Sequence, residues 1–173
     1  MLYWPVEMWP WKKTLARVIR WPLTRFLMNL GIRIIVPRRR VGVALIAFNE
    51  DEHVFMLHHI FRPHAPWGLP GGWMGRHESP ENCIQREIRE ETGLDIQLGP
   101  VVHVAQEAQN AFLTIFFLGR LQPGSMELSA EILEAAWVDP FGLPPGLFAS
   151  SRLAIEKAMH YHPQWLVDEQ VQV

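Results

Sequence analysis

A loop followed by an acidic helix, from Leu69 to Leu94, constrains this chain more than any other stretch. It reads LPGGWMGRHESPENCIQREIREETGL, and Glu87, Glu90 and Glu91 stand at positions i, i+3 and i+4. A helix gathers these three carboxylates into an arc of about 100°. Because like charges at this spacing repel, the arrangement indicates a compensating cation. Carboxylate oxygens suit a hard divalent ion such as Mg²⁺.

A solvated acidic face is the alternative interpretation of the same helix, with Arg86 and Arg89 as basic partners. A helical wheel places the glutamates in the sector of the apolar residues Cys83, Ile84 and Leu94, which favours the core side.

The boundaries of the helix are marked in the sequence. Ser79 suits the N-cap, Pro80 the first helical position and Gly93 the C-terminal end. Ahead of the helix, Pro70-Gly71-Gly72 allows close approach of the backbone to a ligand. A carbonyl there is expected to complete a metal shell, and Glu78 is expected to pair with Arg86 across the loop–helix junction.

The spacing within this stretch resembles a known signature. From Gly72 the chain reads Gly, five residues, Glu78, seven residues, Arg86-Glu87-Ile88, one residue, Glu90-Glu91, one residue, Gly93-Leu94. This pattern is similar to a complete Nudix box, the loop–helix–loop of the Nudix hydrolases. The resemblance implies Mg²⁺- or Mn²⁺-dependent hydrolysis of a nucleoside diphosphate linked to another group.

The resemblance also implies roles for individual residues. The expected catalytic residues are Glu87, Glu90, Glu91, Arg86 and Glu131, with Glu131 preferred to Glu127 and Glu134 as the acid before a late strand. The expected metal ligands are Glu87, Glu90, Glu91 and a carbonyl of Gly71 or Gly72, while Gly72, Glu78 and Gly93 maintain the motif. Glu87 is expected to act as a base or a direct ligand, with Glu131 as the second choice of base, and Arg86 to orient Glu78 and Glu87.

The loop 61–68 precedes the box, and the resemblance makes it part of the rim of the site. Phe61, Arg62 and Trp67 are expected to bind substrate, by stacking on a base or holding a phosphate. For Trp67 a packing role over the core is the alternative.

The remaining pattern predicts an α+β domain, and the resemblance implies a Nudix-like α/β/α sandwich with a mixed central sheet. Strands are expected at 41–48 and 53–58, forming a hairpin, and at 96–105, 111–121 and 136–138, with a second helix at 150–161. The single cysteine, Cys83, fits a reducing compartment, and we expect a cytoplasmic protein.

Charge sets the N-terminus apart, because residues 1–40 contain nine Lys and Arg against one acid, Glu7, within a chain of net charge −2. We expect three parts: a basic, Trp-rich amphipathic arm at 1–38, the hydrolase domain at 39–163 and a loosely ordered tail at 164–173. Residues 11–30 suit peripheral contact with an anionic membrane, on its inner face. Packing of the arm on protein is the alternative.

Substrate identity within the family stays open. The residues Ala108 to Ala111 read AQNA and lack the Pro or Tyr that would mark ADP-ribose or dinucleoside polyphosphate hydrolases. Nucleoside triphosphates, oxidised nucleotides and nucleotide sugars or alcohols remain as substrate classes. A non-catalytic nucleotide-sensing or membrane-associated module is the rival function, although the retained glutamates disfavour it. A nucleic-acid partner is also disfavoured, and a homodimer stays open.

Overall fold

The computed structural model describes residues 22–24, 26–27, 30, 39–106 and 112–170, with the backbone alone described beyond residue 161. The chain divides into two compact units, Met1–Arg38 and Arg39–Val173. In the first unit all the described residues are helical. Most of the expected basic arm, including most of residues 11–30, lies outside the described residues. No helix within the described ranges is both long and apolar enough to cross a membrane.

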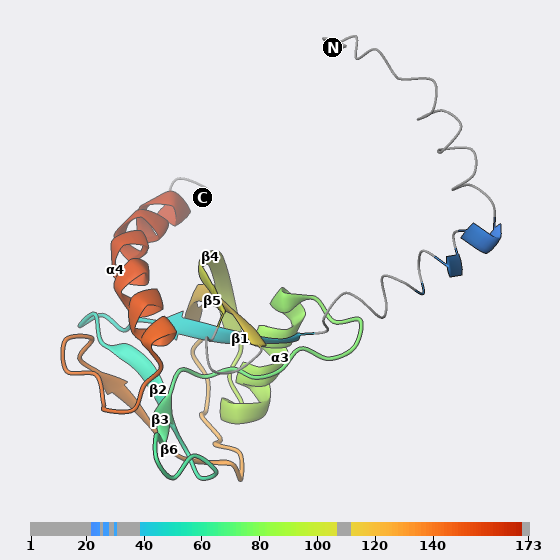
Figure 1. Ribbon diagram of the computed structural model, residues 1–173. Helices are drawn as coiled ribbons and strands as arrows, with labels where there is room; N and C mark the ends of the chain where they lie inside the picture. Colours follow the sequence, from blue (N-terminus) through green and yellow to red (C-terminus); the bar gives the residue numbers. More distant parts are fainter. Residues whose placement is uncertain (1–21, 25, 28–29, 31–38, 107–111, 171–173) are drawn as a thin grey trace, which may run out of the picture. The chain divides into compact units, whose positions relative to one another are not determined.

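Two three-stranded sheets form the framework of the second unit (Figure 1). The first sheet is mixed, because its central strand is parallel to one neighbour and antiparallel to the other; its order is β1 (Arg40–Ala47), β5 (Phe112–Leu121) and β4 (Ile96–Gln106). The second sheet is antiparallel, in the order β3 (Trp67–Gly68), β2 (Val54–His59) and β6 (Ile132–Val138).

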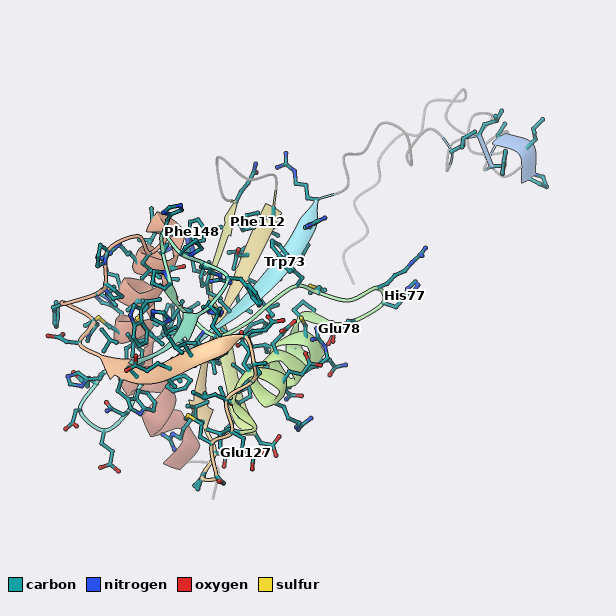
Figure 2. The ribbon with its side chains drawn as sticks, turned by 90° about the horizontal axis from the view of Figure 1, so that it is seen from below. Trp73, His77, Glu78, Phe112, Glu127 and Phe148 are labelled. Atoms are coloured by element: carbon teal, nitrogen blue, oxygen red, sulfur yellow. The ribbon has the colours of Figure 1, made fainter. Side chains whose placement is uncertain are left out.

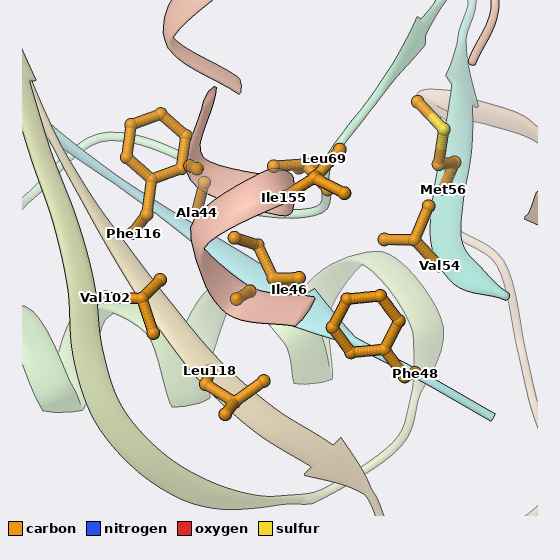
Figure 3. Close-up of a cluster of buried hydrophobic side chains, with 12 residues drawn as sticks. Ala44, Ile46, Phe48, Val54, Met56, Leu69, Val102, Phe116, Leu118 and Ile155 are labelled. Carbon is orange, nitrogen blue, oxygen red and sulfur yellow. The ribbon is translucent and has the colours of Figure 1, made fainter. Parts of the chain in front are cut away.

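The core lies on both sides of β1, whose side chains alternate between two clusters. Ala44 and Ile46 belong to the cluster that includes Ile155 of α4 (Ala149–Gln170), as Figure 3 shows. Val43 and Leu45 belong to the cluster beneath α3 (Pro80–Thr92). Burial on both faces explains the continuous apolar run of this strand. The α+β class and the layers of helix, sheet and helix are confirmed.

The expected hairpin of the first two strands is wrong. The turn between them exists, since the side-chain oxygen of Asn49 accepts from the backbone N–H groups of Asp51 and His53, but only Phe48 and Val54 form a bridge beyond it. The strands then enter different sheets. The physical reason is competition for the edge of β1, because residues 70–74 pair with that edge instead of β2.

Two further boundaries differ from the sequence prediction. Strand β6 begins at Ile132 rather than Ala136, because its early residues pair with the end of β2. The tail after Pro163, expected to be loosely ordered, is helical to Gln170. A proline removes one backbone donor, and here that loss leaves the helix continuous.

Candidate active site

The acidic helix begins and ends where the sequence predicted. The Ser79 hydroxyl accepts from the backbone N–H of Asn82 at 3.2 Å, and Pro80 occupies the first turn. Gly93 ends the helix with φ of 72°, donating its N–H to the carbonyl of Arg89 at 3.0 Å. These caps fix where the helix starts, and therefore which side chains face the preceding loop.

The loop ahead of the helix is hydrogen-bonded along β1. Val43 N donates to Gly72 O and Leu45 N to Pro70 O, each at 2.9 Å, and Met74 N donates to Val41 O at 3.0 Å. Gly71, between them, has φ of 140°, and a β-carbon there would collide with the carbonyl oxygen of Val43. Only glycine accepts this conformation and this closeness without strain. The loop is therefore held rigidly against the core.

Arg86 connects the loop to the glutamates. Its Nε and Nη2 donate to the two carboxylate oxygens of Glu78 at 2.8 and 3.1 Å, which confirms the expected pair. Its Nη1 donates to Glu87 and to Glu90, both at 2.9 Å. The Arg86 hydrogen bond, with that from Gly75 N, lowers the pKa of Glu78 to about 2. Glu78 thus stays ionised and anchors the guanidinium.

The three glutamates have unequal environments. The side chain of Glu90 is 60% exposed and that of Glu87 only 16%. Glu91 Oε2 accepts from Gly71 N at 2.9 Å. Burial, reinforced by the charges of Glu87 and Glu131, raises the pKa of Glu91 to about 8. Burial also raises the pKa of Glu87, against the opposing effect of Arg86.

The oxygen atoms and negative charge of these carboxylates suit a divalent cation. Among the described residues no three His, Cys, Asp or Glu side chains already converge as a metal-binding group, since Arg86 lies between Glu87 and Glu90. Two observations nonetheless match a hard cation. Glu91 has an excess of negative charge around it, and a β-carbon at Gly72 would collide with the Glu87 carboxylate, so the glycine makes room for that group.

Of the two candidate carbonyls, Gly72 O already accepts from Val43 N. The amide of Gly71, in contrast, points toward Glu91. Gly71 is therefore the candidate whose backbone lies against a glutamate, and we favour its carbonyl as the one near the carboxylates.

Glu131 reaches the same region through the loop that precedes β6. Ser129 N donates to the Glu91 carbonyl and Glu127 N to that of Thr92, so this loop packs on the end of α3. The Glu131 carbonyl in turn accepts from Ile60 N at 3.0 Å. Glu131 is close enough for its charge to raise the pKa of Glu91, whereas Glu127 lies against Gly93.

A cleft of about 520 Å³ opens beside the loop. Its aromatic lining comes from Trp67, Trp73, Phe112, Phe116 and Phe148. Trp73 and Phe112 meet edge to face with ring centroids 5.1 Å apart, and Figure 2 shows them at the same end of the domain as Phe148. Such a slot suits a flat aromatic group.

The structure brings two of the three expected substrate residues to this cleft. Arg62 and Trp67 line it, and Trp67 also packs against the core, which confirms the packing role; contact of Trp67 with substrate stays a prediction. Phe61 is 73% exposed and is not part of the cleft lining. Sequence reasoning missed Trp73, Phe112 and Phe148. Trp73 lies within the box itself and could have been considered, but nothing in the sequence links it to Phe112 or Phe148.

Comparison with known proteins identifies relatives of this chain. The family model described as NUDIX domain matches residues 38–157. The 8-oxo-dGDP phosphatase NUDT18 of Danio rerio is 35% identical over 103 residues, which cover 56% of this chain and 31% of that protein. The chain therefore spans about a third of the length of this relative.

Solved structures share the fold. A MutT NUDIX hydrolase from Burkholderia pseudomallei superposes with a TM-score of 0.62 at 24% identity, covering 70% of this chain and 98% of that one. An ADP-ribose pyrophosphatase from Streptococcus suis gives a TM-score of 0.60 at 24% identity, covering 73% of this chain and 92% of that one.

Proposed function

Because the chain belongs to the Nudix hydrolase family, we propose that it hydrolyses the pyrophosphate bond of a nucleoside diphosphate linked to another group. The observation that carries the proposal is the environment of Glu91. Its carboxylate is partly buried and feels the negative charges of Glu87 and Glu131, and its pKa is raised to about 8. A divalent cation would relieve this accumulation of negative charge and would attract the phosphate groups of a substrate.

The proposed metal ligands are Glu87, Glu90, Glu91 and the carbonyl of Gly71. A divalent cation held there would neutralise phosphate charge and lower the pKa of a bound water. Family membership supports a divalent metal, and we propose Mg²⁺ or Mn²⁺ because all the ligands are oxygens. Gly72 contributes by leaving space for the Glu87 carboxylate.

The chain's own side chains orient this site. Arg86, anchored by Glu78, directs the carboxylates of Glu87 and Glu90 through its Nη1. We assign it to positioning rather than to substrate contact, since three glutamates already occupy its donors. Removal of the guanidinium would leave these carboxylates to repel one another.

A carboxylate must accept the proton of the attacking water. Glu131 is our first choice, because its side chain is exposed and no ion pair holds it within the described part of the chain. Glu87 is the alternative through Oε2, since Oε1 accepts from Arg86.

The aromatic cleft supports a substrate with a planar base. Trp73, Phe112 and Phe148 provide stacking surfaces, and Arg62 on the same wall provides donors for a phosphate. The similarity to a protein named 8-oxo-dGDP phosphatase makes oxidised guanine nucleotides the first class to test. Nucleoside triphosphates and nucleotide sugars or alcohols follow.

The test is phosphate release from these nucleotide classes, with and without Mg²⁺. We expect turnover of one class that needs the metal and falls on the order of 100-fold or more in Glu91→Gln and Glu90→Gln. Arg89→Gln is the matched control, because Arg89 is on the same helix but pairs with Asp95. Tight nucleotide binding without turnover would instead indicate a sensing module.

We also propose peripheral membrane contact through the N-terminal unit. The support is the described helical residues Leu23, Phe26, Leu27 and Leu30, which are exposed and spaced as one helical face. The basic excess of residues 1–40 would attract an anionic surface. A homodimer stays a prediction.

A further inference from the structure

His59, the last residue of β2, has a polar atom that the site described so far does not use. The residue is 8% exposed. Its Nε2 is buried, and no hydrogen-bond partner for it exists among the described residues. Buried polar nitrogens are nearly always paired, so an orphan beside a binding cleft calls for a functional explanation.

Arg62 follows within the same turn and lines the cleft. Its backbone N–H donates to the carbonyl of His59 at 3.5 Å, and its carbonyl accepts from Ala65 N at 3.1 Å. No carboxylate in the described ranges lies within ion-pairing distance of its guanidinium. Glu91 acts on Arg62 only through its longer-range charge, which opposes the lowering of the Arg62 pKa by burial.

The tips of both side chains converge on Gly68. A β-carbon added to Gly68 would lie 2.9 Å from Arg62 Nη1 and 3.6 Å from His59 Nε2. Arg62 and Gly68 line the cleft, whereas His59 is not part of its lining and the Nε2 atom is buried. An effect of the histidine on a ligand in the cleft would therefore pass through a neighbouring group, and the tip of Arg62 is the neighbour that lines the cleft.

The charge state of His59 suits an acceptor. Burial, together with the positive charge of Arg62 and the neighbouring His58, lowers the pKa of His59 to about 4. At neutral pH the imidazole is uncharged, and one ring nitrogen accepts a hydrogen bond. Arginine has five N–H donors, so four remain when one is given to histidine.

We propose that His59 is a positioning residue, whose Nε2 accepts an N–H of Arg62 and so directs the remaining guanidinium donors toward a phosphate of the substrate. This inference rests on the proposed function for the presence of that phosphate. It assigns Arg62 the role of an anchor on the cleft wall, and it explains why residue 68 is a glycine.

The test measures binding of a methylene-bridged nucleoside diphosphate analogue by calorimetry, with Mg²⁺ and the full chain. We expect Arg62→Gln to weaken binding about tenfold, as loss of a charged hydrogen bond would. His59→Leu should weaken it nearly as much, and the double variant should be no weaker than Arg62→Gln. His59→Gln places an amide oxygen near the Nε2 position and should retain most of the affinity.

Gly68→Ala provides a second test in which neither His59 nor Arg62 is itself substituted. Its β-carbon would displace the mobile end of Arg62, so binding should weaken with little loss of stability. This variant also decides the question if His59→Leu fails to fold. Arg89→Gln and His53→Gln are matched controls, since neither residue lines the cleft.

Additive losses from His59→Leu and Arg62→Gln, or unchanged affinity in His59→Leu and Gly68→Ala, would overturn the inference. These outcomes are separate from failure of the proposed hydrolysis. Coupled binding losses without turnover would refute the hydrolase and support the positioning role. Normal turnover that depends on Glu91 but not on Arg62 would support the hydrolase and refute the positioning role.

Discussion

Glu87, Glu90 and Glu91 occupy one face of α3, yet their carboxylates differ in exposure, partners and pKa. The spacing in the sequence was sufficient to predict the shared face. It could not predict that the pKa of Glu91 is raised to about 8, because that depends partly on Gly71 and Glu131, which come from other parts of the chain. Contacts between distant segments decide the chemistry of each carboxylate.

The first prediction concerns the pH dependence of stability in the metal-free protein. The pKa of Glu91 is raised from 4.5 to about 8, so the folded state binds a proton at this carboxyl more tightly than the unfolded state does. This difference stabilises the folded protein fully below pH 4.5, and the stabilisation is lost as pH rises through 8. Between pH 6.5 and 8.5 the melting temperature, measured with EDTA, should fall by a few degrees, because a change of about 1 kcal/mol in stability shifts the melting temperature by that much. Glu78 does not interfere, because it is ionised throughout this range, folded or unfolded. His59 is uncharged in the folded protein but half-protonated in the unfolded chain at pH 6.5, so near that pH it opposes the decline, and the comparison with Glu91→Gln removes its effect.

The control is Glu91→Gln, whose melting temperature should lack this decline. Mg²⁺ should stabilise the unmodified protein increasingly as pH rises, because binding favours the ionised carboxylate. A decline of equal size in Glu91→Gln would show that other groups cause it.

The second prediction concerns Arg86→Lys. An ammonium cannot reproduce the two-pronged contact with Glu78 and also reach Glu87 and Glu90. We expect a loss of about 1–2 kcal/mol in the free energy of unfolding, measured in urea, and a fall in kcat of about 10- to 100-fold. Arg89→Lys alters an exposed pair and should change stability by less than about 0.5 kcal/mol. Equal effects from the two variants would contradict the central role of Arg86.

At the scale of elements, α3 and β1 were predictable for different reasons. The helix has its boundaries written in Ser79, Pro80 and Gly93, and the strand is an unbroken apolar run. The partners of β1 were not predictable, because its parallel pairing with β5 joins residues about 70 positions apart. A local sequence pattern carries no information about a partner at that distance. The hairpin prediction failed because residues 70–74, which are also distant in sequence, pair with the edge of β1 in place of β2.

The third prediction separates two adjacent glycines in the loop. Gly71→Ala should lower the free energy of unfolding by about 2–4 kcal/mol, because φ of 140° and the Val43 carbonyl both exclude a β-carbon. Gly72→Ala displaces the end of the Glu87 side chain instead. It should cost about 1 kcal/mol of stability but lower kcat on the order of 100-fold.

Gly142→Ala is the control for both, since the nearest atom to its added β-carbon is 3.7 Å away and its φ is ordinary. Calorimetric melting and phosphate release, measured on the same samples, distinguish the cases. If Gly72→Ala proved the more destabilising of the two, the assignment of Gly71 as the strained position would be wrong.

For the whole molecule, the sequence indicated two units of unlike charge, and the structure divides the chain after Arg38. The cleft shows the limit of such reasoning. Its walls come from four separate stretches, around residues 42–44, 62–73, 112–116 and 146–151. No periodicity within one stretch predicts which side chains of another will face it.

The fourth prediction tests the N-terminal unit. The full chain should co-sediment with vesicles that contain phosphatidylserine, and less so with neutral vesicles or at high salt. Deletion of residues 1–36 should abolish this binding, and Phe26→Ser with Leu27→Ser should weaken it by removing apolar contact. Unchanged sedimentation of the shortened chain would contradict membrane attachment through this segment.

The pairing of residues 70–74 with β1 has a consequence for how the protein loses activity. These hydrogen bonds are made to β1, which is buried on both faces, so we expect that the loop does not open independently of the core. The amide protons of Val43, Leu45 and Met74 should exchange with deuterium only through global unfolding, while that of the exposed His77 exchanges rapidly. Inactivation by urea should then coincide with the cooperative loss of circular dichroism, with no inactive native-like state preceding it.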